Sequence, residues 1–448
     1  MQEKEEIFNG EWFIPGSQIK AHGKLTVTNN GINLYITDPT NRNLTSKNEE
    51  DNIPLIYGIG EHREVLTLFN CSGFSGSYDA NLMIFGNKHY SEFESLKFKL
   101  IQIIIPSFDS WINSKSFKKE DIDSGFQITY KKTEPITYKI DNNLTLQINF
   151  HCQLSDINDI SRLRKFNLSE TTQIQLISSS DEGYTLKEFL KTVTSLQSFI
   201  SFISEDGCNV EFINAFSDEK EFLKNPFMGN IIYALLHYNK YEENNFSRNR
   251  YLITYDDIKG DFSGIMKNWF EFITKSPSIM NLVLYDYFYK GPFDENRFLN
   301  VVRALEIFHA NFYIKETISN KISKETKKLI INTVPKEFED EIKDWLSNVN
   351  TTKLHTRLEK LTSEFNSMNL EKQFDADFIM KAKESRNYYT HLGVKKKNVV
   401  DGNELLSLTE DCRTLLTFVI LKQLGVNIET LKKIFNNYIP MSHYSRYF

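Results

Sequence analysis

An arginine, an asparagine and a histidine lie close together in the segment ESRNYYTHLG, which runs from Glu384 to Gly393. On a helix, the separation of five positions between Arg386 and His391 corresponds to roughly 7–8 Å along the axis. Both side chains can therefore address one phosphodiester near the end of that helix. Arg386 is permanently charged and can hold a phosphate through two hydrogen bonds while it stabilises charge on the oxygens.

His391 precedes the helix breaker Gly393, so we expect it in the last turn of the helix. The helix dipole favours a protonated imidazole at that end. Because histidine exchanges protons near neutral pH, it can remove or supply the protons when a 2′-hydroxyl attacks phosphorus. The segment thus predicts cleavage of an RNA phosphodiester, with Asn387 as an orienting hydrogen-bond partner.

The spacing alone is weak support, because an arginine followed by a histidine at such a distance also arises by chance. A second match exists in Arg303 and His309. We expect His309 in the middle of a helix, without a helix break after it, and interpret it as a packed histidine with no catalytic role. On spacing alone, Arg386 and His391 could likewise be an ordinary surface pair.

Other residues are candidates for smaller roles. Three consecutive lysines could bind an RNA backbone: Lys395, Lys396 and Lys397. The alternative is that they are simply part of a solvated loop. Tyr388 could stack on a base, whereas Tyr389 falls on an apolar stripe and is expected in the core. Glu306 could orient Arg386 or Arg303, or could be an ordinary surface carboxylate.

The length, charge and composition of the chain limit the classes of protein to which it can belong. It has 448 residues, which suggests two or three domains, and a formal charge of −6, so any nucleic-acid site must be a local cationic patch. The four cysteines form no CxxC pair, and no His, Asp and Glu cluster has metal-ligand spacing. The N-terminal residues do not resemble a signal peptide, and no apolar run has membrane-helix length. We expect a cytoplasmic protein without a metal or other cofactor.

The first 175 residues mostly alternate apolar and polar positions, as β-strands do. Asn29-Asn30-Gly31 predicts a hairpin turn between strands at Lys24–Thr28 and Ile32–Ile36. Further strands are predicted at Val65–Phe69, Asn81–Phe85, Lys97–Ile105, Phe126–Lys131 and Leu144–Cys152. We interpret Glu61–Glu64 and Gly73–Gly76 as turns. The pattern predicts an antiparallel sandwich or open barrel.

From residue 184 the period becomes helical, and Val210–Phe216 then looks like a strand again, which indicates a mixed α/β extension of the β-rich domain. Polar residues at Ser247–Arg250 and glycines at Gly260 and Gly264 predict a domain boundary nearby. We therefore divide the chain into a β-rich domain at residues 1–260 and an α-helical domain at residues 261–448. The fold class is α+β.

The second domain is predicted to be a helical bundle. Asp294 can cap a long helix that runs through His309 and beyond. The other predicted helices are Ile265–Lys275, Ser278–Phe288, Lys336–Val349, Leu354–Phe365, Ala376–Thr390, Asn403–Leu424 and Asn427–Tyr438.

Arg386, Asn387 and His391 thus lie on the helix before the last long one, and their Arg-polar-x-x-x-His pattern resembles the motif of HEPN domains. The helical segments Phe298–Phe308 and Leu354–Leu361 are similar to those that precede this motif in ApeA-type HEPN proteins of bacterial antiphage defence. Several segments of this chain resemble the opening of the N-terminal domain of that family: Gly10–Pro15, Gly23–Thr26, Gly58 and Val65–Phe69.

The resemblance implies a metal-independent endoribonuclease that arrests the infected cell, with Arg386 and His391 as catalytic residues. It also implies that two HEPN domains pair as a homodimer with a composite site, and that the N-terminal domain senses a phage-derived trigger. RNA is then the substrate, and no membrane is involved. The alternative is a non-catalytic protein in which the HEPN domain dimerises and the β-rich domain binds a ligand.

Overall fold

The computed structural model describes residues 5–28, 31–38, 44, 51–114, 116–154, 168–210, 212–218, 229–234, 251–288, 293–313, 322–349, 352–436 and 438. The chain divides into two compact units, Met1–Lys267 and Asn268–Phe448. This division falls inside a helix that begins at Phe262. The boundary at residues 260 and 261 stays a prediction, and the turn at Asn29 and Asn30 and the segment Ser247–Arg250 lie outside the described residues.

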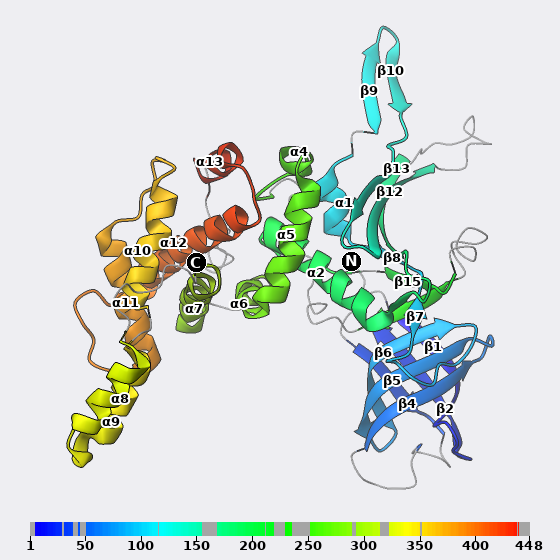
Figure 1. Ribbon diagram of the computed structural model, residues 1–448. Coiled ribbons are helices and arrows are strands. Elements are labelled where there is room, and N and C mark those ends of the chain that lie inside the picture. The colour runs from blue at the N-terminus through cyan, green and yellow to red at the C-terminus, as the bar shows by residue number, and fades with distance from the viewer. Residues whose placement is uncertain are drawn as a thin grey trace. The chain divides into compact units, whose positions relative to one another are not determined.

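Unit 1 contains a closed antiparallel barrel (Figure 1). Its strands are β1 (Glu6–Phe13), β2 (Lys20–Thr28), β3 (Gly31–Ile36), β4 (Asp51–Gly60), β5 (Val65–Phe74) and β6 (Ser77–Gly86). They are ordered β6-β3-β2-β1-β4-β5, and β5 pairs back with β6. The antiparallel β-rich prediction is confirmed, and the barrel is closed rather than open.

The barrel interior is filled by apolar side chains that alternate along the strands. Trp12 is completely buried, and its indole nitrogen donates a hydrogen bond of 3.1 Å to the carbonyl of Gly23. A Cβ atom at Gly58 would lie 2.3 Å from the Trp12 ring. Glycine at position 58 is therefore required by the close approach of this ring.

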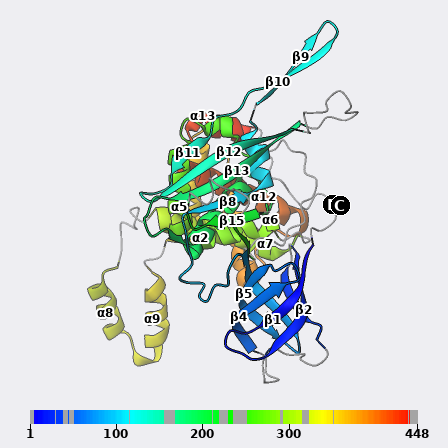
Figure 2. The same cartoon turned by 90° about the vertical axis from the view of Figure 1, so that its right-hand side faces the viewer.

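Strand β6 also joins the barrel to a second part of the same sheet, because its Leu82–Phe85 half pairs with β16 (Asn230–Ala234). Figure 2 shows much of this second part as a curved layer. From β16 outward its strands are β15 (Phe212–Phe216), β8 (Leu100–Ile104), β13 (Leu168–Ser178), β12 (Leu144–Leu154) and β11 (Ile136–Lys139). The predicted mixed α/β extension therefore continues the barrel sheet.

The remaining elements of unit 1 are smaller. They are β7 (Lys97–Phe98), α1 (Pro106–Ile112), β9 (Phe117–Ile122), β10 (Gly125–Tyr130), β14 (Tyr184–Thr185), α2 (Leu186–Ser204) and α4 (Tyr255–Ile258). Helix α2 begins with a capping box between Thr185 and Glu188, and apolar residues at helical spacing bury one side of it. The predicted turns at Glu61–Glu64 and Gly73–Gly76 are confirmed, the latter as the end of β5 and its connection to β6.

Unit 2 is helical, as predicted. After α5 (Phe262–Lys275) its elements are α6 (Pro277–Phe288), α7 (Glu295–Phe312), α8 (Lys324–Thr333), the 3₁₀ helix η2 (Lys336–Phe338), α9 (Glu339–Asn348), α10 (Leu354–Asn366), α11 (Ala376–His391), α12 (Gly402–Gln423) and α13 (Ile428–Asn436). Helix α7 packs against α6, α10, α11 and α12. The segment predicted as one helix from Lys336 to Val349 is η2 followed by α9, and α8 was not predicted.

Asp294 caps α7 as predicted, since its side chain accepts a hydrogen bond from the backbone N–H of Arg297. Helix α7 runs through His309 and beyond, as predicted, but the expectation that His309 lies in the middle of the helix is wrong. Helix α7 ends at Phe312, so His309 lies in its last turn. The imidazole is buried and stacks on the Tyr313 ring, with centroids 5.1 Å apart.

Candidate active site

Helix α11 places the predicted motif at its C-terminal end. The helix begins at the cap Asp375, whose carboxylate accepts a hydrogen bond of 2.9 Å from the backbone N–H of Phe378. It ends because Leu392 adopts a left-handed conformation with φ of 46°, and the Leu392 N–H donates to the carbonyl of Tyr388. His391 is thus the last helical residue, in agreement with the predicted position in the last turn.

One face of α11 is packed and holds the following loop in place. Ser385 is buried, and its hydroxyl accepts a hydrogen bond from the backbone N–H of Val400. The hydroxyl of Tyr389 donates 2.9 Å to the Val400 carbonyl, and its ring lies 6.4 Å from that of Phe298. Burial raises the pKa of Tyr389. These contacts fix the rotation of α11, so the opposite face, with Asn387 and His391, is directed to solvent.

Arg386 is oriented by a carboxylate from α7. Its Nη2 lies 3.3 Å from Oε2 of Glu306, and its Nη1 donates a hydrogen bond of 3.2 Å to Oδ1 of Asn387. The side chains of Arg386 and Glu306 are 30% and 21% exposed. A partly exposed ion pair contributes only about 0–1 kcal/mol, so it orients the guanidinium more than it stabilises the fold. The structure thus places Glu306 against Arg386 and leaves Arg303 exposed.

Two further interactions in unit 2 hold α7, and the sequence did not suggest either. Nη1 of Arg357 on α10 donates a hydrogen bond of 2.6 Å to the backbone carbonyl of Glu306. Asp286 on α6 is buried and accepts hydrogen bonds from Arg297 on α7 and Arg413 on α12. In a sequence, such buried charges are indistinguishable from surface charges. Together these contacts position the Glu306 carboxylate.

His391 is exposed and makes no hydrogen bond or ion pair with Arg386 or Asn387 among the described residues. Five helical positions correspond to a rotation of about 140° beyond one full turn. The side chains of Arg386 and His391 therefore leave the helix in different directions. Within one chain, the motif supplies a fixed guanidinium and a separate, accessible imidazole.

The residues after His391 combine apolar and cationic side chains. Leu392 is 77% and Val394 is 90% exposed, which sequence reasoning did not anticipate. Lys395 pairs with Asp401, and this hydrogen bond raises the pKa of Lys395. Lys396 and Lys397 are exposed. Tyr388 is half-buried, and its ring centroid lies 5.1 Å from that of Tyr389.

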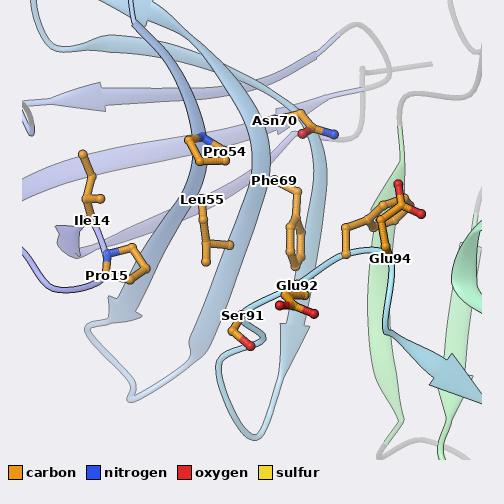
Figure 3. A pocket seen from close by; sticks show the side chains of 10 residues that line it. Ile14, Pro15, Pro54, Leu55, Phe69, Asn70, Ser91, Glu92 and Glu94 are labelled. Atoms are coloured by element: carbon orange, nitrogen blue, oxygen red, sulfur yellow. The ribbon is translucent and has the colours of Figure 1, made fainter.

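Unit 1 has a pocket of about 440 Å³, seen in Figure 3. Its wall is formed largely by Ile14, Pro15, Pro54, Leu55 and Phe69, with Ser91 and the carboxylates of Glu92 and Glu94 beside them. None of the residues predicted for catalysis or RNA binding lines it. The pocket suits an apolar group, and its acidic side chains do not suit a phosphate.

In the part of the chain that the structure describes, no three His, Cys, Asp or Glu side chains are grouped so that they could hold a metal ion. None of the four cysteines, all of which the structure describes, forms a disulfide bond. None of the described helices combines the length and the apolar character that crossing a bilayer requires.

Comparison with known protein families gives two matches. The family model described as ApeA N-terminal domain 1 matches residues 7–269, more than half of the chain. The model described as Apea-like HEPN matches residues 299–430, which include Glu306 and all of α11. Neither the curated proteins nor the solved structures contain a match to this chain.

Proposed function

The chain belongs to the ApeA family of HEPN proteins, and from this premise we propose that it is an endoribonuclease that acts in antiphage defence by abortive infection. HEPN domains are in general ribonucleases, and this supports the class of reaction. The observation that carries the proposal is the end of α11, where an exposed His391 follows an Arg386 that Glu306 holds in place.

The proposed reaction uses only side chains of this protein. His391 removes the proton from a ribose 2′-hydroxyl, and the 2′-oxygen attacks the adjacent phosphorus. The bond to the 5′-oxygen breaks, and that oxygen takes up a proton from an imidazolium. The products are a 2′,3′-cyclic phosphate and a 5′-hydroxyl. Arg386 stabilises the charge that develops on the phosphate oxygens, and Asn387 orients the guanidinium through the hydrogen bond that it accepts.

A homodimer supplies what one chain lacks. The reaction needs a base and an acid, whereas each motif has one histidine, and Arg386 and His391 leave α11 in different directions. A two-fold axis beside α11 would bring two His391 side chains to one site. The exposure of Leu392 and Val394 supports a contact here, because two large apolar side chains beside a catalytic residue are covered on dimerisation.

The remaining roles follow from position and charge. Lys396 and Lys397 are exposed cations after the motif and are proposed to bind the RNA backbone, while Lys395 is engaged with Asp401 and contributes less. Tyr388 is proposed to stack on a base. Unit 1 is proposed to sense the phage-derived trigger. We propose a cytoplasmic location, since cysteines without disulfide bonds fit a reducing compartment.

The test is cleavage of total cellular RNA by the full-length protein in EDTA, with fragment ends identified chemically. The wild type is compared with His391→Ala and with His355→Ala, a histidine of α10 that forms a partly exposed pair with Glu359. We expect cyclic phosphate ends from wild type and His355→Ala only. Lysate of phage-infected cells is added in parallel to supply a trigger. Intact RNA under both conditions would favour the non-catalytic alternative.

A further inference from the structure

Strands β9 and β10 form a two-stranded sheet that is separate from the twelve-stranded sheet of unit 1. Figures 1 and 2 show this hairpin as a ribbon that extends away from the rest of unit 1. All residues from Lys118 to Thr129 are exposed. A two-stranded hairpin that packs against nothing is at best marginally stable in water, so this hairpin is expected to gain stability from additional strands.

The hairpin carries apolar side chains on one face. Phe126, Ile128 and Tyr130 alternate along β10 and therefore point to the same side. Phe117 on β9 pairs with Tyr130, and their ring centroids are 5.2 Å apart. Phe126 is 60% and Ile128 is 46% exposed, so the β10 part of this face is a continuous apolar stripe in contact with solvent. On the same face, the charged residues Asp121 and Lys119 of β9 lie opposite Phe126 and Ile128.

The two edges of the hairpin differ in charge. Four of the six residues of β9 are charged, Lys118, Lys119, Glu120 and Asp121, which is how proteins protect a free strand edge. The six residues of β10, GFQITY, carry no charge. Among the described residues, β10 pairs with β9 alone, so its other edge is open. The unprotected edge is thus the one that bears the apolar side chains.

We infer that β10 pairs antiparallel with β10 of a second copy of this chain, with Ile128 opposite Ile128 at the two-fold axis. Such an axis is perpendicular to the sheet and leaves each side chain on its own face. Phe126 of each copy then lies opposite Tyr130 of the other, and Gln127 opposite Thr129. The two apolar stripes merge into one, and the other face has polar pairs.

The side chains favour a second copy over an unrelated strand because β10 is complementary to itself. Aromatic and aliphatic pairs across strands stabilise a sheet, and like charges that face each other destabilise it. Pairing centred on Ile128 places Lys131 opposite Gly125, so no like charges meet. Strand β9 cannot pair with itself in this way, since centring on Lys119 or Glu120 opposes two identical charges.

The pairing can be tested by disulfide trapping of the full-length protein. A Cys152→Ser background leaves only buried cysteines. Ile128→Cys places two thiols at the axis, where the Cβ atoms of opposed residues are close enough for a disulfide. The control is Ile122→Cys on β9, because Ile122 is 52% exposed and so has a similar exposure. We expect the Ile128→Cys variant to form covalent dimers at least about tenfold faster under mild oxidation.

A mixing experiment tests the register. Phe126→Cys and Tyr130→Cys chains, combined in equal amounts, should form the mixed disulfide faster than either variant links to itself. Phe126→Cys mixed with Ile122→Cys is the control. Equal rates for Ile128→Cys and Ile122→Cys, or no covalent dimer from either, would overturn the inference. Trapping at Ile128 without the mixed disulfide would overturn the proposed register. These outcomes do not depend on RNA cleavage, so they are independent of the nuclease proposal.

Discussion

Trp12 in the barrel and His391 at the end of α11 differ in how strongly their surroundings hold the side chain. The Trp12 indole is completely buried and donates a hydrogen bond to the carbonyl of Gly23. Its ring packs so closely on Gly58 that no larger residue fits there. His391 is exposed, and its position is set by the helix end alone. The Trp12 side chain is held by the packing around it, and the His391 side chain is left accessible to solvent.

This difference implies that stability and activity depend on different residues. A substitution in the barrel interior leaves a cavity and is expected to lower the free energy of unfolding. A substitution on the exposed face of α11 removes few contacts and is expected to leave that free energy nearly unchanged. Proposals about chemistry can therefore be tested at α11 with variants that remain folded.

The largest effect is expected from Trp12→Ala. Removal of a fully buried indole should lower the free energy of unfolding by about 3–5 kcal/mol. Chemical denaturation of the full-length protein, followed by circular dichroism, measures this. His391→Ala, measured alongside, should change the free energy by less than about 0.5 kcal/mol. Similar losses for both variants would contradict the comparison between the two regions.

Arg386→Lys should have the next largest effect, on cleavage rather than on stability. Lysine keeps the charge but cannot form two parallel hydrogen bonds to a phosphate. We expect RNA cleavage to fall about 100-fold, as the loss of one donor to a developing oxyanion typically causes. Single-turnover rates measure the effect. A variant of the second arginine-histidine match, Arg303→Lys, is the control, because Arg303 is exposed and should tolerate the change.

Local elements could be predicted from the sequence because their signals are local. The β2–β3 hairpin follows from alternating side chains, and α7 follows from Asp294 and its apolar spacing. Barrel closure could not be predicted, since the β3–β6 and β1–β4 pairs join strands that are distant in the chain. Helix α8 was missed because it has no buried residue and hence little apolar contrast.

The same distinction applies to the candidate site. The position of His391 in the last turn was predicted correctly from the helix breaker Gly393, although the left-handed residue that ends α11 is Leu392. The sequence left open whether Glu306 faces Arg386 or Arg303, because that depends on how α7 packs against α11. The buried Asp286 could not be recognised, since its partners Arg297 and Arg413 come from other helices. The catalytic roles themselves stay a prediction.

Glu306→Gln tests whether the carboxylate beside Arg386 has an orienting role. Glutamine keeps the shape and one acceptor but loses the charge, so the guanidinium should sample more orientations. We expect single-turnover cleavage to fall about tenfold, and stability to change by no more than about 1 kcal/mol because the pair is partly exposed. Glu359→Gln on α10, which removes the partner of His355, is the matched control. Equal rates for both variants would remove the proposed role of Glu306.

The smallest effect concerns the pH dependence of the barrel. Cys71 lies in the barrel interior, and burial raises the pKa of its thiol from 9.0 to about 12. Below pH 9 the thiol is protonated in both states and contributes no pH dependence. Above pH 9 only the unfolded chain ionises, so the free energy of unfolding should fall with rising pH, by about 1 kcal/mol at pH 9.7.

The comparison of wild type with Cys71→Ala isolates this contribution. The alanine variant loses stability at every pH through the cavity that it leaves, but it has no thiol to ionise at this position. The difference in free energy of unfolding between the two proteins should therefore be constant from pH 7 to 8.5 and then shrink between pH 9 and 10. A difference that stays constant across the whole range would mean that the thiol ionises as readily in the folded barrel as in the unfolded chain. The tightly packed interior inferred around Trp12 would then be wrong, because only a barrel that excludes water can raise the pKa of this thiol.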